Sequence, residues 1–453
     1  MKKSLFILPL MALAITSCNN TEDLLFDGSA AERLEQGRAD AISKLTADGG
    51  LWAMEYFANE DEPGYVMLCR FDKNGSVEIS ANHKWIDNQF KQERSLWDIV
   101  SDNGTVLSFN SYNSLFHIFS DPADITGPYQ PTNPDQDDKP IDETGFGHEG
   151  DYEFQIMSES DPNTVRLLGK KRNYNIYLRK LDESTDEQTY LEGLVKKQDI
   201  FKTKFKKFIL TDKAGREYVM TDFESNIPSL YPRSYFDEAQ NKYIEADSVS
   251  QTKSANGIFT YSGFRYSTPF TAKHADDSEW EISELHWAED GTLVNEEEGL
   301  RLTAPSPAEN FDMVSFTWTI DPESFKGKFA TAYSSAYNAV IESLGTKNML
   351  GTIDFTWAAN SGEVSHLILS RLGTKRCQDF FNVSKIKGES LTSTYTSSNS
   401  TADRYNKEIP ELWEFKKLFF NEFNMKNNDP MNPDVIHFSL VSDPDSGFDA
   451  VLQ

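Results

Sequence analysis

Residues 65–80, Tyr65-Val-Met-Leu-Cys-Arg-Phe-Asp-Lys-Asn-Gly-Ser-Val-Glu-Ile-Ser80, carry the clearest structural signal of the chain. Tyr65, Met67, Cys69 and Phe71 recur at every second position and so share one face of a strand. The Asn-Gly pair that follows accepts the positive φ angles of a tight turn. We therefore predict an antiparallel hairpin of strands 64–71 and 76–80. Cys69 is expected to be a buried thiol in it, not a disulfide partner.

Strand-like runs continue on both sides of this hairpin, from Leu51 to about Arg179. Aromatic and β-branched residues alternate there with Gly, Asn and Asp turns. Further strands are expected at 51–57, 105–110, 114–119, 151–157, 164–169 and 174–179. In the run 151–157, Tyr152, Phe154 and Ile156 should share the buried face. Residues 121–150, rich in prolines and acids, are either a surface excursion or a functional lid.

Segments with helical spacing of apolar residues lie before and after these strands. Ser29-Ala-Ala-Glu32 is a capping box, and Gly49-Gly50 ends the helix that it predicts. A second capping box begins at Ser184, and helical spacing continues to Phe208 with many lysines between the apolar residues. This second helix either connects two domains or binds a membrane surface.

The second half is again rich in strands. We expect strands at 314–320, 353–357 and 436–441, a helix from Phe329 to Leu344, a helix from Pro410 through Phe423, and an exposed loop at 391–403. The fold class is therefore mainly β with α (α+β). An antiparallel β barrel or sandwich at 49–182 is followed by a connecting helix at 183–208 and a second α+β domain at 209–453.

The N-terminus has the layout of a bacterial lipoprotein signal. Lys2 and Lys3 precede an apolar segment, Leu5–Ile15, and Ile15-Thr16-Ser17-Cys18 follows. Eleven apolar residues are too few for a membrane span, which needs about 20. We predict a signal peptide at 1–17, lipid attachment at Cys18, and a tether with the first helix at 18–48. Ordinary secretion with cleavage near Ser17 is the alternative.

The 453-residue chain is strongly acidic, with a net charge of −28 that becomes −30 when the two signal lysines are removed. Such a body repels nucleic acid and anionic head groups. We therefore expect no nucleic-acid partner and contact with the membrane through the acyl chains alone.

The sequence contains none of the common catalytic signatures. No two of its seven histidines lie within four residues of each other, and it lacks Gly-x-Ser-x-Gly and the phosphate-binding loop. We predict no catalytic residue, no metal ligand and no cofactor. His148 with Glu149 and Asp151 would join a metal site only with partners from elsewhere, and otherwise forms a solvated turn. With 72 acidic residues, a hydrolase that uses two dispersed carboxylates remains the alternative.

Several short motifs in the first half resemble a Bacteroidetes lipoprotein family of unknown function, DUF4302. They are Phe26-Asp27, Gly50-Leu-Trp52, Glu55-Tyr-Phe57, Gly64-Tyr65, Phe71, Gly75-Ser-Val77, Leu107-Ser-Phe-Asn110, Tyr112-Asn113, His117-Ile-Phe-Ser-Asp-Pro122, Gly150-Asp-Tyr-Glu-Phe154 and Gly169-Lys-Lys171. The resemblance covers about 26–180 and implies a lipoprotein similar to accessory components of outer-membrane import systems for glycans or peptides. Gly50-Leu-Trp52 also looks like the opening of lipocalin-like barrels, which favours a barrel over a sandwich.

One polar cluster is the candidate binding site. Asn110, Tyr112, Asn113 and His117 are expected to approach the strand that contains Asp151. They form either a ligand site or a hydrogen-bonded turn that holds the sheet. Trp85, Phe90 and Tyr129 are further candidates for stacking on sugars, or pack locally.

We expect a non-catalytic binding or accessory lipoprotein for glycan or peptide acquisition. It would lie in the outer membrane, facing the periplasm or the cell surface, and its partners would be import components. A structural role in envelope assembly is a further alternative.

Overall fold

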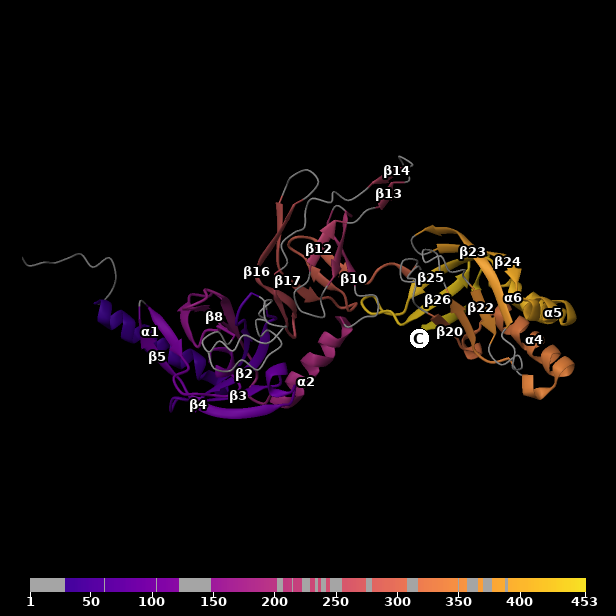
Figure 1. Cartoon of the computed structure of the whole chain (residues 1–453). Coiled ribbons are helices and arrows are strands. Elements are labelled where there is room, and N and C mark those ends of the chain that lie inside the picture. Colours follow the sequence, from indigo (N-terminus) through magenta and orange to yellow (C-terminus); the bar gives the residue numbers. More distant parts are fainter. Residues whose placement is uncertain are drawn as a thin grey trace, which may run out of the picture.

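Three antiparallel sheets follow one another along the computed structural model (Figure 1). This confirms the mainly β, α+β class. The structure describes residues 29–60, 62–102, 104–121, 148–201, 207–213, 215–221, 229–232, 235–237, 242–244, 255–273, 279–307, 317–348, 350–356, 366–369, 377–387 and 390–453. The predicted signal, Cys18 and most of the excursion at 121–150, Tyr129 included, lie outside these residues.

The first sheet has nine strands in the order β4-β3-β2-β1-β9-β8-β7-β6-β5. They are β1 (Leu51–Tyr56), β2 (Tyr65–Phe71), β3 (Ser76–Ala81), β4 (Lys91–Leu96), β5 (Asp98–Ser101), β6 (Thr105–Ser108), β7 (Glu153–Met157), β8 (Thr164–Gly169) and β9 (Asn175–Lys180). Trp97 alone separates the two edge strands, β4 and β5, so the sheet curls until its edges meet. The buried indole of Trp97 donates a hydrogen bond to the Ser76 carbonyl (3.0 Å) and fixes this corner.

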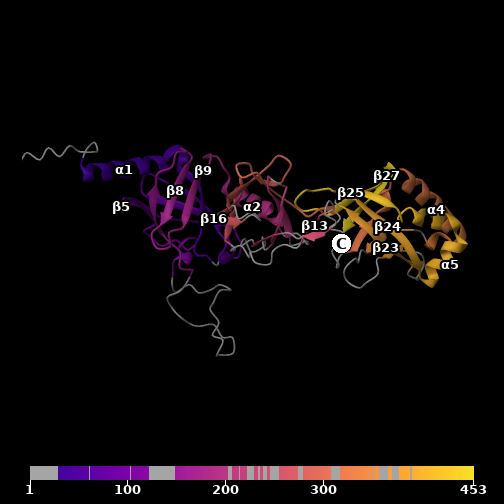
Figure 2. The same cartoon turned by 90° about the horizontal axis from the view of Figure 1, so that it is seen from above.

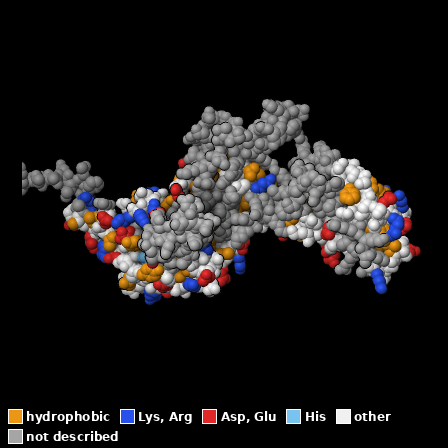
Figure 3. Space-filling model, viewed as in Figure 1, with side chains coloured by type: hydrophobic (Ala, Val, Ile, Leu, Met, Phe, Trp, Pro, Cys, Tyr) orange, Lys and Arg blue, Asp and Glu red, His pale blue; other side chains and the backbone are white. Residues whose placement is uncertain are grey.

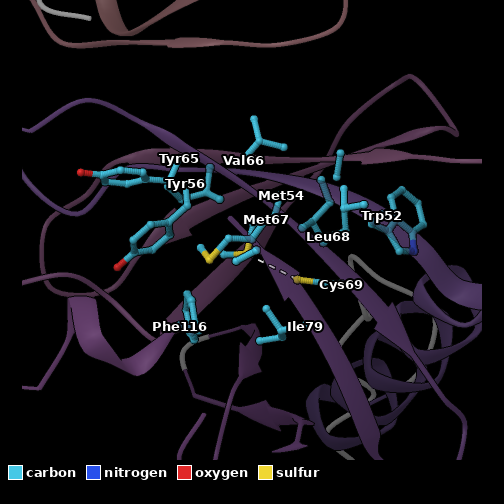
Figure 4. Packing of buried hydrophobic residues seen from close by; sticks show 14 of the residues in the cluster. Trp52, Met54, Tyr56, Tyr65, Val66, Met67, Leu68, Cys69, Ile79 and Phe116 are labelled. Atoms are coloured by element: carbon cyan, nitrogen blue, oxygen red, sulfur yellow. Dashed lines mark hydrogen bonds between the residues drawn. The ribbon is translucent and has the colours of Figure 1, made fainter. Parts of the chain in front are cut away.

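The hairpin of β2 and β3 forms as predicted. Gly75 has φ 83° and donates its N–H to the Asp72 carbonyl (3.0 Å), which closes the turn. Cys69 is a free thiol with no exposed surface, and its Sγ lies 3.9 Å from Met54 Sδ in the core shown in Figure 4. Burial raises the pKa of this thiol. The alternation read from the sequence therefore identifies one buried face of β2, and Val66 and Leu68 on the other face are buried as well.

The helix α1 (Ala30–Leu45) packs along the β5 and β6 end of this sheet (Figures 1 and 2). Its capping box forms as predicted, because Glu32 N–H bonds the Ser29 side chain and Glu32 bonds the Ser29 N–H. Arg38 donates to the Ile99 carbonyl of β5 (2.9 Å). At the other end, the buried Trp52 indole donates to the Leu45 carbonyl (2.8 Å), so the strand that begins at Gly50-Leu-Trp52 holds the end of the helix.

The second sheet has eight strands in the order β12-β11-β10-β19-β18-β17-β16-β15. They are β10 (Lys207–Thr211), β11 (Glu217–Thr221), β12 (Ser229–Pro232), β15 (Gly257–Phe259), β16 (Gly263–Lys273), β17 (Glu279–Trp287), β18 (Leu293–Asn295) and β19 (Leu300–Thr303), with the separate pair β13 (Tyr235–Asp237) and β14 (Lys242–Ile244). The helix α2 (Glu187–Gln198) leads into it. Gly64 N–H bonds the Gly257 carbonyl (2.8 Å), and Arg265 of β16 bonds Glu55 of β1 (2.7 Å), so the two sheets share a polar junction.

The third sheet closes into an eight-stranded barrel. Its strands are β20 (Thr317–Ile320), β21 (Ile353–Thr356), β22 (His366–Leu369), β23 (Cys377–Lys387), β24 (Ser390–Ser398), β25 (Glu422–Asn427), β26 (Val435–Leu440) and β27 (Asp443–Leu452). The helices α4 (Lys328–Leu344), α5 (Ser400–Glu408) and α6 (Pro410–Lys417) cover one end (Figure 2). On the other side, Met431 is buried in the core of the second sheet, which ties the barrel to it.

The region predicted as one α+β domain, 209–453, thus contains two sheets, and several of its element predictions are wrong. Residues 391–403 lie in β24 and α5 instead of a loop. Ser and Thr dominate this stretch, so it shows no apolar alternation, although Leu391, Ser393 and Ala402 are buried. The last helix ends at Lys417, and Phe423 enters the same core from β25.

Two further predictions in the first half are wrong, and one strand was not predicted. Residues 114–119 form a turn and the 3-10 helix His117–Phe119 instead of a strand. The second helix begins at Glu187 with Asp186, not Ser184, as its N-cap, and it ends at Gln198, so Phe208 belongs to β10. The strand β4 escaped prediction because it is an exposed edge strand, whose Lys-Gln-Glu-Arg run shows no apolar alternation.

Candidate functional site

Two tyrosines and a histidine form an exposed aromatic platform, which we define as Tyr112, His117 and Tyr152. Tyr112 is 58% exposed and Tyr152 is 45% exposed. The Tyr112 and His117 rings are stacked, with centroids 5.6 Å apart and planes 28° apart, and the Tyr152 centroid lies 5.8 Å from that of His117. The platform therefore presents aromatic rings to solvent at the point where the sequence predicted a polar cluster.

Asn113 holds this segment against the edge strand β4. Its buried side-chain amide donates to the Glu93 carbonyl (3.1 Å) and to Ser95 Oγ (3.2 Å). Its side-chain oxygen accepts from the Leu115 N–H (3.1 Å), and its carbonyl accepts from the His117 N–H (2.8 Å). These local bonds compete with a strand ladder, which explains why 114–119 turns instead of extending.

His117 is held as a neutral ring by two backbone partners. Its Nδ1 accepts from the Asn113 N–H (3.0 Å), so the Nε2 that faces the Phe109 carbonyl (3.0 Å) must be the protonated nitrogen. Burial lowers its pKa below the ordinary histidine value. With both nitrogens engaged, the ring serves as a fixed surface between the tyrosines and is not available as a metal ligand or a base.

Asn110 and Asp151, the other two predicted site residues, do not lie among the platform rings. Asn110 has an exposed side chain, and its N–H bonds the Leu96 carbonyl (3.2 Å). Asp151 is buried, and its carboxylate accepts from the N–H groups of Lys171 (2.6 Å) and Arg172 (2.9 Å). Burial raises its pKa, although these two bonds lower it in part. Asp151 therefore shapes the turn between β8 and β9 and does not join the platform.

Sequence reasoning missed Tyr152 as a site residue. It was expected on the buried face with Phe154, but β7 begins only at Glu153 and Tyr152 is 45% exposed. Its carbonyl still accepts from the Phe109 N–H (3.2 Å). The Tyr-Glu-Phe alternation was the available signal, and it placed Tyr152 on the wrong face. Outside the platform, Leu96 of the edge strand β4 is also 54% exposed.

His148 is buried, so the expected solvated turn is wrong. Its Nδ1 lies 2.5 Å from Glu62 Oε1, and Tyr65 Oη donates to the other oxygen (3.1 Å). Burial raises the pKa of Glu62, but the bonds from His148 and Asn59 outweigh it, and the pKa is lowered. This pair is structural: it anchors the chain beside the junction of the first two sheets.

The candidate sugar-stacking residues Trp85 and Phe90 pack locally. The Trp85 ring lies 4.3 Å from the His148 ring, and its indole donates to Tyr65 Oη (3.1 Å). Phe90 is partly buried against the first core. Among the described residues, no group of three His, Cys, Asp or Glu side chains is placed to hold a metal ion. The described helices also include none long and apolar enough to cross a membrane.

A family model described as "Domain of unknown function (DUF4302)" matches residues 22–287, which is more than half of the chain. No curated protein matches the sequence significantly. Among solved structures, the beta subunit of DNA polymerase from Streptococcus pyogenes aligns at 10% identity over 91% of this chain and 97% of that chain. Its TM-score of 0.13 is too low to support any argument. The matched residues include the first sheet, the aromatic platform and most of the second sheet.

Proposed function

The chain belongs to the family of domains of unknown function DUF4302, and we propose that this member is a non-catalytic, lipid-anchored protein that binds glycans at the cell envelope. The aromatic platform carries the proposal. Flat aromatic rings exposed to water are costly unless a ligand covers them, and the faces of sugar rings stack well on them. The platform also lies within the residues that the family model matches.

The platform is rigid before any ligand arrives. Asn113 and the two backbone partners of His117 fix the central ring, and Tyr112 and Tyr152 lean against it. A preformed surface loses little conformational entropy when it binds, so even a small contact area can give useful affinity. Asn110 follows Phe109, whose carbonyl holds the His117 ring, and its exposed amide is a candidate to bond sugar hydroxyls.

The proposed anchor fits this role. An acyl chain on Cys18 would keep the body at the membrane, and a single chain binds only reversibly, so two or three chains would be needed for stable attachment. Acidic and basic side chains are interspersed on the face seen in Figure 3. With a net charge of −28, the body itself would not adhere to anionic lipid. Such a protein would hold glycans near outer-membrane import components.

The geometry gives less support to a carboxylate-dependent hydrolase. A general acid needs a raised pKa and a proton to donate. Asp151 has the raised pKa, but backbone N–H groups occupy its oxygens. A groove of about 850 Å³ beside α4 and α6 contains Asp443, whose pKa the neighbouring Lys328 lowers. Neither position offers an acid ready to protonate a leaving group.

A glycan array probed with the soluble body, residues 19–453, tests the proposal. We expect binding to at least one glycan class, reduced at least about tenfold by Tyr112→Ala or Tyr152→Ala. Tyr261→Ala, which removes an exposed tyrosine on the second sheet (37% exposed), is the matched control and should change nothing. Silence across the array, or equal binding by all three variants, would refute a platform for sugars. If the array is silent but a protein partner requires the two platform tyrosines, the surface serves assembly instead.

The anchor needs its own experiment, since Cys18 is outside the described residues. In cell fractionation, the unaltered protein should partition with the membrane and Cys18→Ser should appear in the soluble fraction. Cys69→Ser is the matched control, because that thiol is buried in the core and cannot carry a lipid. Membrane partition of Cys18→Ser would contradict lipid anchoring.

A further inference from the structure

A pocket of about 300 Å³ lies at the junction of the first two sheets. It is lined by Glu159, Asp161, Thr164, Asn175, Tyr177, Arg179, Arg265, Tyr266, Ser267, Pro269, Ser283 and Glu284. These residues come from β8, β9 and the preceding turn on one side and from β16 and β17 on the other (Figure 1). All of them fall within the residues that the family model matches. Glu159 follows the end of β7, whereas Tyr152 precedes its start, so the pocket is separate from the aromatic platform.

Arg265 is the most buried charged residue of this lining. Its side chain is 8% exposed, its Nε bonds Glu55 Oε2 (2.7 Å), and its Nη1 donates to the Tyr266 carbonyl (3.3 Å). The guanidinium also lies 4.6 Å from the centre of the Tyr177 ring. Within the described part of the chain, its Nη2 is buried without a hydrogen-bond partner. A buried charged donor left unpaired is costly, so this nitrogen calls for an acceptor from outside the protein.

Positive charge exceeds negative charge in the cluster around Glu55, in which Arg265 is buried and Arg179 is 38% exposed. Glu55 is the shared partner of Arg179 (3.4 Å) and Arg265 (2.7 Å), so two guanidinium groups meet one carboxylate. Arg179 also donates from Nη1 to Thr164 Oγ1 (3.0 Å). An anionic oxygen beside Arg265 Nη2 would balance the charge and complete its hydrogen bonds.

The exposed edge of the same pocket carries the opposite charge. Glu159 and Glu284 have side chains 28% and 37% exposed, and Asp161 stands beside them in the lining. Glu159 lies 3.7 Å from Arg166, Glu284 lies 3.2 Å from His286, and Asp161 accepts from Thr164 Oγ1 (2.6 Å). Asp161 also accepts from the Asn163 N–H (2.9 Å), and Glu159 from the Ser160 N–H (3.3 Å). A carboxylate has about four lone-pair sites, so these contacts still leave acceptor positions for a cationic group. The pocket therefore combines the buried Arg265 guanidinium with a group of carboxylates at its exposed edge.

We propose that this pocket binds an amino-acid zwitterion, as a free amino acid or a dipeptide. Its carboxylate accepts from Arg265 Nη2, and its ammonium group lies among the rim carboxylates. The ligand carries one charge of each sign, which suits a lining that contains both arginines and acids. The volume of about 300 Å³ admits a ligand of this size. The proposal does not depend on glycan binding by the platform.

Isothermal titration calorimetry with the same soluble body tests it. The probes are the twenty free L-amino acids and alanyl-alanine, followed by the N-acetyl and the amide forms of the best binder, with acetate and glucose alongside. We expect at least one zwitterion to bind, and each capped form to bind at least about tenfold more weakly, because each has lost one of the two charges. Acetate and glucose should not compete.

Ser283→Trp fills the pocket from β17 without touching the Glu55 cluster and should abolish binding. Glu281→Trp is the matched control, two residues along the same strand and outside the lining, and should bind like the unaltered chain. Arg265→Lys keeps the charge but removes Nη2 and should weaken binding, with circular dichroism to confirm folding. The proposal is overturned if no zwitterion binds, if N-acetyl amino acids or acetate bind equally well, if glucose displaces the ligand, or if Ser283→Trp still binds. Tyr112→Ala should leave this binding unchanged, so failure here and failure of the platform can be distinguished.

Discussion

Glu55 and Arg265 are 210 positions apart, yet Glu55 Oε2 lies 2.7 Å from Arg265 Nε, with both side chains buried between the first two sheets. Removing one partner of a buried ion pair leaves the other charge uncompensated, which typically costs about 3–5 kcal/mol. We predict that Glu55→Gln lowers the free energy of unfolding by about that amount. Equilibrium unfolding in urea, followed by circular dichroism, measures it.

Glu78→Gln is the control for this prediction, because Glu78 pairs with Arg94 at 3.9 Å on the surface of the same sheet. Exposed pairs contribute less than about 1 kcal/mol. If the two variants lose equal stability, the junction between the sheets is not held by this pair.

A second buried pair joins the helix α6 to the barrel strand β23. Lys416 Nζ is 2.7 Å from Asp379 Oδ2, and neither side chain has exposed surface. Asn406 joins them, since its amide donates to Asp379 Oδ1 (3.0 Å) and its oxygen accepts from Lys416 (2.8 Å). We predict that Lys416→Met destabilises the barrel by about 3–5 kcal/mol, because it leaves the Asp379 carboxylate buried without its charged partner.

Lys417→Met provides the neighbouring control. Lys417 has a 44% exposed side chain and pairs only with Glu414 on the surface of α6, so its loss should cost less than about 1 kcal/mol. Urea unfolding of both variants makes the comparison. A Lys416→Met barrel as stable as Lys417→Met would mean that the network relaxes around the lost charge.

His83 makes the first sheet sensitive to acid. Its Nε2 donates to the Leu115 carbonyl (2.8 Å), and burial lowers its pKa from 6.5 to about 4. Below pH 6.5, His83 becomes protonated in the unfolded chain but stays neutral in the folded chain. The free energy of unfolding therefore keeps its full value above pH 6.5 and decreases as the pH is lowered, by about 2 kcal/mol at pH 5 and about 3 kcal/mol near pH 4.

His83→Gln isolates this effect from other titrating groups, because its amide can still donate to the Leu115 carbonyl but takes up no proton. Between pH 7 and pH 5, the urea midpoint of unfolding should decrease more in the unaltered chain than in the variant. Equal losses would show that His83 is protonated in the folded state as readily as in the unfolded state.

The sequence predicted those features that depend on neighbours in the chain. The 65–80 hairpin, the capping box at Ser29 and the buried Cys69 follow from alternation and turn chemistry over a few residues. Glu55 and Arg265 gave no such signal. Both lie in strands where a charged residue would be expected to face solvent, and only the packing of two sheets buries them together.

The candidate site shows the same division. Tyr112, Asn113 and His117 are close in sequence, and their polar cluster pointed to the platform. Tyr152 was assigned to the wrong face, because alternation cannot tell where a strand's ladder begins. The pocket at Arg265 was not predicted, since its lining is drawn from two sheets and becomes a site only when they pack.

Gly50 marks the closest backbone approach in the first sheet, and it provides the last prediction. It has φ 65°, and a Cβ there would lie 2.2 Å from the Phe71 carbonyl oxygen. Gly215 has a similar φ of 76° but nothing within 4 Å of the same position. Gly215→Ala should cost only the left-handed backbone penalty, about 1–2 kcal/mol. Gly50→Ala must also displace β2 and should cost more than about 3 kcal/mol, measured by urea unfolding. If the two substitutions cost the same, β2 can move away from the start of β1, and the tight entry to the first strand is not needed to hold the sheet.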